Sequence, residues 1–172
     1  MKKLGTRGLR WLKIAHLFFV SLWVGGAISL LIIFFLARPS SGDELYAVNM
    51  ALKLVDDFVI IPGANGCLLT GLVYGIWTKW GFFRHNWLKV KWVMTVTQIV
   101  FGTFWLGPWL NGNAAIAAAE RLGALQNPVY IHNYTMNAFW GPLQVSLILV
   151  MVWISVDKPW KGNTKKQGTG GG

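Results

Sequence analysis

Residues Trp11–Ala37 read WLKIAHLFFVSLWVGGAISLLIIFFLA, an almost unbroken run of apolar side chains. Three further runs of the same character follow, at Phe58–Thr78, Trp92–Leu110 and Met136–Val156. Each run holds about 19–27 residues, which is enough for a helix to cross a hydrocarbon layer of about 30 Å. The sequence therefore predicts an integral membrane protein with four spans.

The secondary structure of these spans follows from the lack of water in the bilayer. A backbone in lipid has to satisfy its own hydrogen bonds, either as a helix or in a closed barrel. Barrel strands alternate polar and apolar residues, whereas these runs are continuous. We therefore predict an all-α, four-helix bundle in one transmembrane domain, residues 1–160, followed by a disordered, basic and Gly-rich cytoplasmic tail, residues 161–172. The expected helices are 11–37, 44–79, 87–110 with an outer extension to 125, and 130–156.

The charge of the chain is strongly positive and unevenly distributed. Lys and Arg number 16 against 6 Asp and Glu, which gives a net charge of +10. On a soluble protein this balance would suggest nucleic acid binding. Here the basic residues gather before the first run, between the second and third, and after the fourth. The positive-inside rule then places both termini in the cytoplasm, as an even number of spans requires. We predict a multi-pass protein of a bacterial inner membrane, surrounded by the lipid bilayer and without a nucleic acid partner.

Local signals mark helix starts and bends. Ser41 and Glu44 have the spacing of a capping box, which predicts a helix start in the outer loop. Pro62, Pro108 and Pro142 fall in the outer halves of the second, third and fourth spans. Proline removes a backbone hydrogen bond, so each is expected to kink its helix.

Two ionisable residues lie at one depth near the cytoplasmic side. His16 is about 7–8 Å deeper than Trp11, and Lys91 is about 6 Å deeper than Trp87. Ionisable groups within a span are rare and usually face the bundle interior. Two interpretations of His16 stay open: a buried imidazole bonded to a neighbouring helix, or a proton-transfer group or axial haem ligand. Lys91 either extends to the interface or accompanies His16 at a cofactor.

The other histidines are poor partners for His16. His132 stands at the outer entrance of the fourth span, near the opposite face, and His85 lies in the cytoplasmic loop. Asp56 and Asp57 are expected to be interface charges, and with His132 they would make only a weak metal site. No metal site is therefore predicted.

The outer half of the bundle offers a second group of polar residues. Asn65 and Gln144 have matching depths, with Asn137, Trp140 and Asp57 nearer the surface. One interpretation is an outward-facing polar pocket for a small solute or a metal. The other is that Asn65 and Gln144 hydrogen-bond each other across helices, a common contact between spans.

Small residues allow close helix approach. Gly71–Gly75 is a GxxxG motif, and Gly25 precedes Gly26. Such residues pack helices within a bundle or between protomers. A homodimer or a larger membrane complex is therefore one expectation for the partners of this chain.

Several of these residues also carry a resemblance. The stretch Trp11–His16, followed by Trp23–Gly26, resembles the first helix of the HemJ and CopD membrane families, and Trp87 with Lys91 resembles the start of the third HemJ helix. The run Thr78–Lys91 is most similar to a neighbouring group of small bacterial integral membrane proteins of unknown function.

The resemblance implies roles that the residues alone do not. HemJ is a haem-binding protoporphyrinogen oxidase, which implies haem b as a cofactor, His16 as its ligand and Lys91 as a partner of a porphyrin carboxylate. CopD is implicated in copper uptake. A copper site of the CopD type would require a cluster of Met or His residues near the outer face, where this chain offers only His132 and Met136. HemJ proteins carry a histidine where this chain has Lys89.

Three functions follow as hypotheses. The first is an accessory or assembly protein without chemistry of its own. The second is a haem- or porphyrin-associated redox membrane protein that uses His16 and Lys91. The third is a binder or transporter of a small solute or metal in the outer pocket. No nucleotide-binding, nucleophile-elbow or HExxH motif is present to indicate a specific enzyme.

Overall fold

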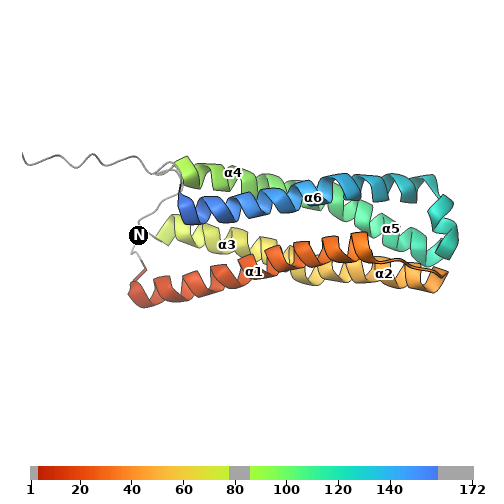
Figure 1. Ribbon diagram of the computed structural model, residues 1–172. Helices are drawn as coiled ribbons and strands as arrows, with labels where there is room; N and C mark the ends of the chain where they lie inside the picture. The colour runs from red at the N-terminus through yellow and green to blue at the C-terminus, as the bar shows by residue number, and fades with distance from the viewer. Residues whose placement is uncertain (1–3, 78–85, 159–172) are drawn as a thin grey trace, which may run out of the picture.

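The computed structural model describes residues 4–77 and 86–158, and all regular structure in these two ranges is helical. The helices join into four long rods (Figure 1). The first rod is α1 (Thr6–Leu36) and the fourth is α6 (Pro128–Asp157). The second comprises α2 (Gly42–Val55), the π-helical turn η1 (Asp56–Ile60) and α3 (Ile61–Trp77). The third comprises α4 (Asn86–Phe101), the π-helical turn η2 (Gly102–Leu106), α5 (Gly107–Glu120) and the 3₁₀ turn η3 (Arg121–Gln126).

The four rods have the composition of membrane spans. Each is long and apolar enough to cross a bilayer. The bundle also hides polar side chains and exposes large apolar ones such as Phe18, Phe104 and Phe139, which are 57%, 67% and 66% exposed. In water this arrangement would forfeit most of the hydrophobic stabilisation, whereas in lipid it costs little. The predicted all-α fold with four membrane helices is confirmed. The buried polar residues are Asn49, Thr70, Gln98, Asn113, Asn133 and Asn137.

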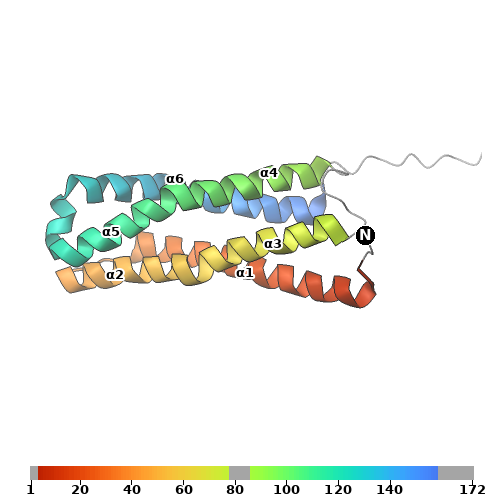
Figure 2. The same cartoon turned by 180° about the vertical axis from the view of Figure 1, so that it is seen from behind.

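The rods form two antiparallel hairpins. The α1 rod pairs with the α2–α3 rod, and the α4–α5 rod pairs with α6 (Figures 1 and 2). The start of α1 and the end of α6 lie together, at what we call the terminal end of the bundle. The link between α1 and α2 and the turn η3 lie at the opposite, distal end.

A seam of small residues holds the first hairpin together. A Cβ added at Gly63 would lie 2.6 Å from the backbone N of Trp23, and one added at Gly66 would overlap the Phe19 ring. The absence of these two side chains lets α1 and α3 approach closely, as in other membrane helix pairs. Buried residues from α1, α3 and α6 continue this core: Trp23, Ala27, Ala64, Cys67, Ile148 and Met151.

Two of the three predicted proline kinks take the form of π turns. Pro62 follows η1 and Pro108 follows η2, each by two residues. A proline ring collides with the carbonyl four residues earlier, which here belongs to Phe58 or Phe104 within the π turn. Widening the helix at that carbonyl accommodates the ring. In contrast, α6 continues through Pro142 as an α-helix.

The predicted capping box is displaced by one residue. The Ser41 hydroxyl accepts a hydrogen bond from the Glu44 N–H at 3.2 Å, as expected. The Glu44 carboxylate, however, accepts from the N–H and hydroxyl of Ser40, at 2.6 and 2.8 Å, and not from the N–H of Ser41. The helix start at Gly42 is thus fixed from both sides.

The helix bounds differ modestly from those expected. The first helix starts at Thr6 instead of Trp11, because the polar residues before the apolar run remain helical. The outer extension of the third helix exists and ends in η3 at Gln126. The expected tail, residues 161–172, lies outside the described residues.

Candidate functional site

A cavity of about 400 Å³ opens at the terminal end, between the two hairpins. Its volume is within the range of about 300–1,000 Å³ that is typical of small-molecule sites. Because all four rods contribute to it, its shape depends on how the hairpins pack together. The residues used below come from α1 (Lys13, His16), α3 (Gly71, Tyr74), α4 (Trp87, Lys91, Trp92) and α6 with its C-cap (Ser155, Lys158).

His16 is fixed in this cavity by a hydrogen bond to α3. Its Nδ1 lies 2.7 Å from the Thr70 hydroxyl oxygen. The imidazole ring also meets the Tyr74 ring edge-on, with 5.7 Å between the ring centroids. The bond joins helices 54 residues apart in sequence, so it orients the imidazole relative to the first hairpin.

The surroundings of Thr70 determine the tautomer of His16. The Thr70 hydroxyl lies 2.6 Å from the Gly66 carbonyl oxygen, to which it donates its single hydrogen. It can then only accept from His16, so Nδ1 carries the ring hydrogen. The Nε2 lone pair is left available, and no described residue bonds to Nε2. A histidine held through Nδ1–H with a free Nε2 is prepared to bind a metal or to accept a proton.

The cavity carries positive charge. Lys13, Lys91 and Lys158 line it from three different rods, and no acidic residue of the described chain does. Within the described residues, the Lys91 ammonium has no hydrogen bond or ion pair. Lys158 lies over the Trp87 ring, with 5.8 Å from its Nζ to the ring centroid. The wall therefore combines cations with aromatic surface, which suits an anion that has an apolar body.

A second cavity, of about 210 Å³, continues from the first toward the bundle core. His16, Lys91 and Ser155 line both cavities. Cys67 lines only the deeper one, whose other walls are mostly apolar. The imidazole and the ammonium thus lie where a polar, basic mouth meets an apolar interior.

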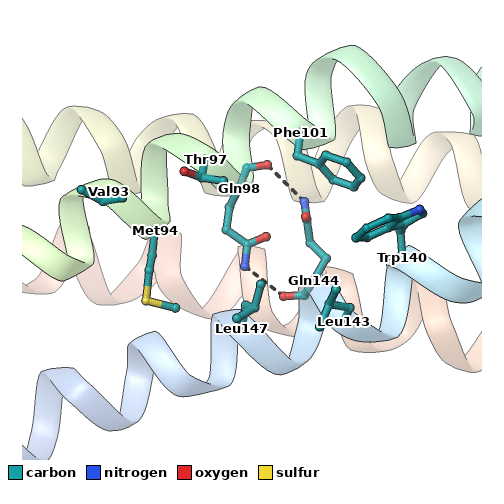
Figure 3. A pocket seen from close by; sticks show the side chains of 9 residues that line it. All are labelled: Val93, Met94, Thr97, Gln98, Phe101, Trp140, Leu143, Gln144 and Leu147. Atoms are coloured by element: carbon teal, nitrogen blue, oxygen red, sulfur yellow. Dashed lines mark hydrogen bonds between the residues drawn. The ribbon is translucent and has the colours of Figure 1, made fainter.

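The predicted pair Asn65–Gln144 does not form. Gln144 instead exchanges hydrogen bonds with Gln98 of α4: each amide nitrogen donates to the backbone carbonyl of the other residue, both at 3.1 Å (Figure 3). Asn65 is exposed on α3. Counting residues along a helix estimates the depth of a residue but does not specify the face on which it lies.

The remaining outer residues separate into three places. Asn137 and Gln144 line one small internal cavity, whereas Trp140 and Gln144 line a groove of about 240 Å³ between α4 and α6 (Figure 3). Asp57 forms an ion pair with Lys53, 2.6 Å from its Nζ. The neighbouring Asp56 lines the small cavity instead. The single outward pocket expected from the sequence is therefore not observed in the described residues.

The other histidines and the GxxxG motif lie elsewhere. His132 is exposed at the distal end and meets the Trp109 ring edge-on at 6.5 Å, and His85 lies outside the described residues. Residues 4–77 and 86–158 hold no cluster of three metal-binding side chains. Gly71 and Gly75 line the basic cavity, with ordinary contact from Trp92 to a Cβ added at Gly71.

Sequence reasoning found His16 and Lys91 but missed their companions. Thr70, the hydrogen-bond partner of His16, is an ordinary threonine in an apolar run and carries no signal of its own. Gln98, which bonds to Gln144, is a polar residue at mid-span, and that is the same sequence signal that marked Asn65.

Comparison with known proteins adds no assignment. No family model, no curated protein and no solved structure matches this chain.

Proposed function

We propose that the protein binds a carboxylate-bearing tetrapyrrole, such as haem b, in the basic cavity of the terminal end. His16 would hold the iron through its Nε2, and Lys91 would pair with a carboxylate of the ligand. The observation that carries the proposal is the hydrogen bond from His16 to Thr70, which leaves Nε2 in the same cavity as the Lys91 ammonium, both without a partner among the described residues.

The donor set fits this class of ligand. Tetrapyrroles are broad, apolar and anionic at one edge, and the cavity has aromatic walls with three lysines at its mouth. A single histidine is sufficient to hold haem iron, as in globins. The iron would supply one-electron redox chemistry when bound, while Thr70 and Tyr74 keep the imidazole oriented.

Absorbance spectroscopy tests the proposal. Haem is added to the protein purified in mild detergent, and the Soret band is followed during titration. We expect the wild type to bind and His16→Ala to lose the band of the ligated haem. His132→Ala is the matched control because His132 is exposed at the other end, and it should bind like the wild type. A wild type that stays colourless would contradict the proposal and favour an accessory role without chemistry.

The role of Lys91 needs its own pair of variants. Lys91→Met should weaken haem affinity about tenfold, the equivalent of about 1.4 kcal/mol, without changing the axial ligand. Lys89→Met is the control, because Lys89 lies two residues away on the same helix but is exposed. The affinity for iron-free protoporphyrin should fall in Lys91→Met and stay unchanged in His16→Ala.

The proposal includes an orientation in the membrane. We infer a bacterial inner membrane with the terminal end in the cytoplasm, since the basic flanks of the runs favour it. In a Cys67→Ala background, Ser40→Cys should react with an impermeant maleimide in intact spheroplasts, whereas Gly5→Cys should react only after lysis. The reverse pattern would invert the topology. Whether the chain acts alone, as a homodimer or in a larger complex stays a prediction, and mild-detergent sizing would test it.

A further inference from the structure

A small internal cavity of about 80 Å³ lies where the two interrupted rods meet and shares no lining residue with the basic cavity. Both π turns line it: η1 supplies Asp56 and Ile60, and η2 supplies Gly102 and Leu106. The facing side chains of α1 are apolar, and α6 supplies Asn137 and Gln144. Interrupted helices often border functional sites in membrane proteins, because the irregular backbone is tolerated only inside the bundle.

The Asp56 carboxylate lacks a compensating charge in this cavity. Among residues 4–77 and 86–158 it has no hydrogen bond or ion pair. The nearest ammonium on its own rod, Lys53, is engaged by Asp57 at 2.6 Å and by Asn111 at 2.9 Å. In the described chain, α1, η2 and α6 bring no charged group to the cavity. An anion against apolar walls is costly unless a cation accompanies it.

Two amide oxygens remain available beside the carboxylate. Asn137 is only 9% exposed, and its Nδ2 donates to the Asn133 carbonyl at 3.1 Å, so its Oδ1 is left without a described partner. The Gln144 Nε2 donates to the Gln98 carbonyl, so the Gln144 Oε1 remains available as a ligand (Figure 3). The cavity therefore combines one carboxylate with two neutral oxygens, the ligand type that hard cations prefer.

We propose that this cavity binds one monovalent cation, with Asp56 as the charged ligand and the side-chain oxygens of Asn137 and Gln144 as neutral ligands. One carboxylate balances one positive charge, whereas a divalent ion would leave uncompensated charge against apolar walls. The cavity admits only a small ion with a few waters. A sodium ion and a proton share this chemistry, and the test separates them.

The sodium test compares melting temperatures of the detergent-purified protein in sodium chloride and in choline chloride of equal concentration, at alkaline pH. Sodium that binds only the folded state raises the melting temperature with concentration. We expect a rise of several degrees in the wild type and none in Asp56→Asn. Asp57→Asn is the matched control: it removes the adjacent carboxylate, which already has a lysine partner, and should keep the sodium response.

Further measurements address two other cases: a proton bound in place of sodium, and an Asp56→Asn variant that fails to fold. If a proton is the ligand, sodium has no effect, and the wild-type melting temperature falls as rising pH removes the proton, whereas that of Asp56→Asn does not. If Asp56→Asn is unfolded, Asn137→Ala serves in its place, because it keeps the carboxylate. With sodium as the ligand, Asn137→Ala should raise the half-effective sodium concentration about tenfold. With a proton as the ligand, Asn137→Ala should keep the pH response. A wild type that responds neither to sodium nor to pH, or an Asp56→Asn protein that responds like the wild type, would overturn the proposal.

Discussion

The two ends of the bundle are built from the same four rods but differ in the side chains that line the space between them. At the terminal end the rods enclose about 400 Å³, lined by lysines and aromatic rings. At the distal end side chains connect the rods: Asn49 donates to the Tyr130 hydroxyl at 3.1 Å, and Arg121 lies over the Tyr46 ring at 4.4 Å. A cavity of about 390 Å³ also lies there, with Asn49 and Tyr130 in its wall. Among the described residues, Arg38 is the one charged side chain that lines it, against three lysines in the terminal cavity. The two ends therefore differ in charge and not in volume.

The difference follows from residue size and polarity along the rods. Gly63 and Gly66 allow α1 and α3 to touch, and the core around them is continuous. Toward the terminal end, the large rings of Trp87 and Trp92 stand where small residues would close the gap. The rods are thus in tight contact at the α1–α3 seam and looser around the terminal cavity, and substitutions in the seam and in the cavity wall should separate the two behaviours.

The largest effect is expected from a methyl group added to the seam. Gly63→Ala places a Cβ 2.6 Å from the Trp23 backbone, which cannot rotate away, so α1 and α3 must separate. Overpacking of this kind costs about 1–3 kcal/mol or more. Gly71→Ala meets only ordinary contact with Trp92 and should be within about 0.5 kcal/mol of the wild type. Thermal unfolding in detergent measures both, and equal losses would show that the seam and the wall of the terminal cavity are equally tight.

Some features of the fold and of the candidate site could be predicted from the sequence, and others could not. The apolar runs and basic flanks were enough to predict four helices and their approximate bounds, because the bilayer allows few alternatives. His16 and Lys91 could be matched in depth because both are counted from an interfacial tryptophan. For Asn65 and Gln144 such counting was not sufficient, because packing between helices decides which face of a helix a residue occupies. The π turns before Pro62 and Pro108 were expected only as kinks, because sequence does not choose among the ways to relieve a proline clash.

A second substitution pair tests the buried amides of the distal end. Asn49→Leu leaves the Tyr130 hydroxyl without its donor. It also places a branched side chain at a buried position, since Asn49 is only 5% exposed. Leaving a buried polar group unpaired costs about 1–3 kcal/mol. The matched change Asn65→Leu puts an apolar side chain at an exposed position of a candidate membrane span and should be neutral or stabilising. Chemical unfolding in mixed detergent compares them, and a larger loss from Asn65→Leu would mean that Asn65 has a partner in the assembled protein.

A smaller effect is expected at the terminal end. Thr70→Val removes the acceptor of the His16 Nδ1–H while keeping the side-chain shape. The loss of one hydrogen bond costs about 1 kcal/mol, and the freed imidazole should populate both tautomers, which nitrogen NMR of labelled histidine detects. Thr97→Val is the control because Thr97 is exposed on α4 and lines a different groove. An unchanged tautomer in Thr70→Val would contradict the assignment of the Nδ1 hydrogen.

The smallest effect is expected for the Lys53–Asp57 pair, which also locates the edge of the bilayer. The two side chains are 34% and 30% exposed, and an ion pair in contact with water contributes about 0–1 kcal/mol and weakens with salt. Asp57→Asn should therefore lower the free energy of unfolding by less than about 1 kcal/mol. Had the pair been surrounded by lipid, removing one partner would leave a charge in a medium of low dielectric, and the loss would reach about 3–5 kcal/mol. A loss of that size, insensitive to salt, would place the bilayer boundary beyond Lys53 and bring α2 into the membrane. A small, salt-sensitive loss leaves α2 outside it and puts Asp56 just inside, where an ion from the aqueous side has only a short distance to travel.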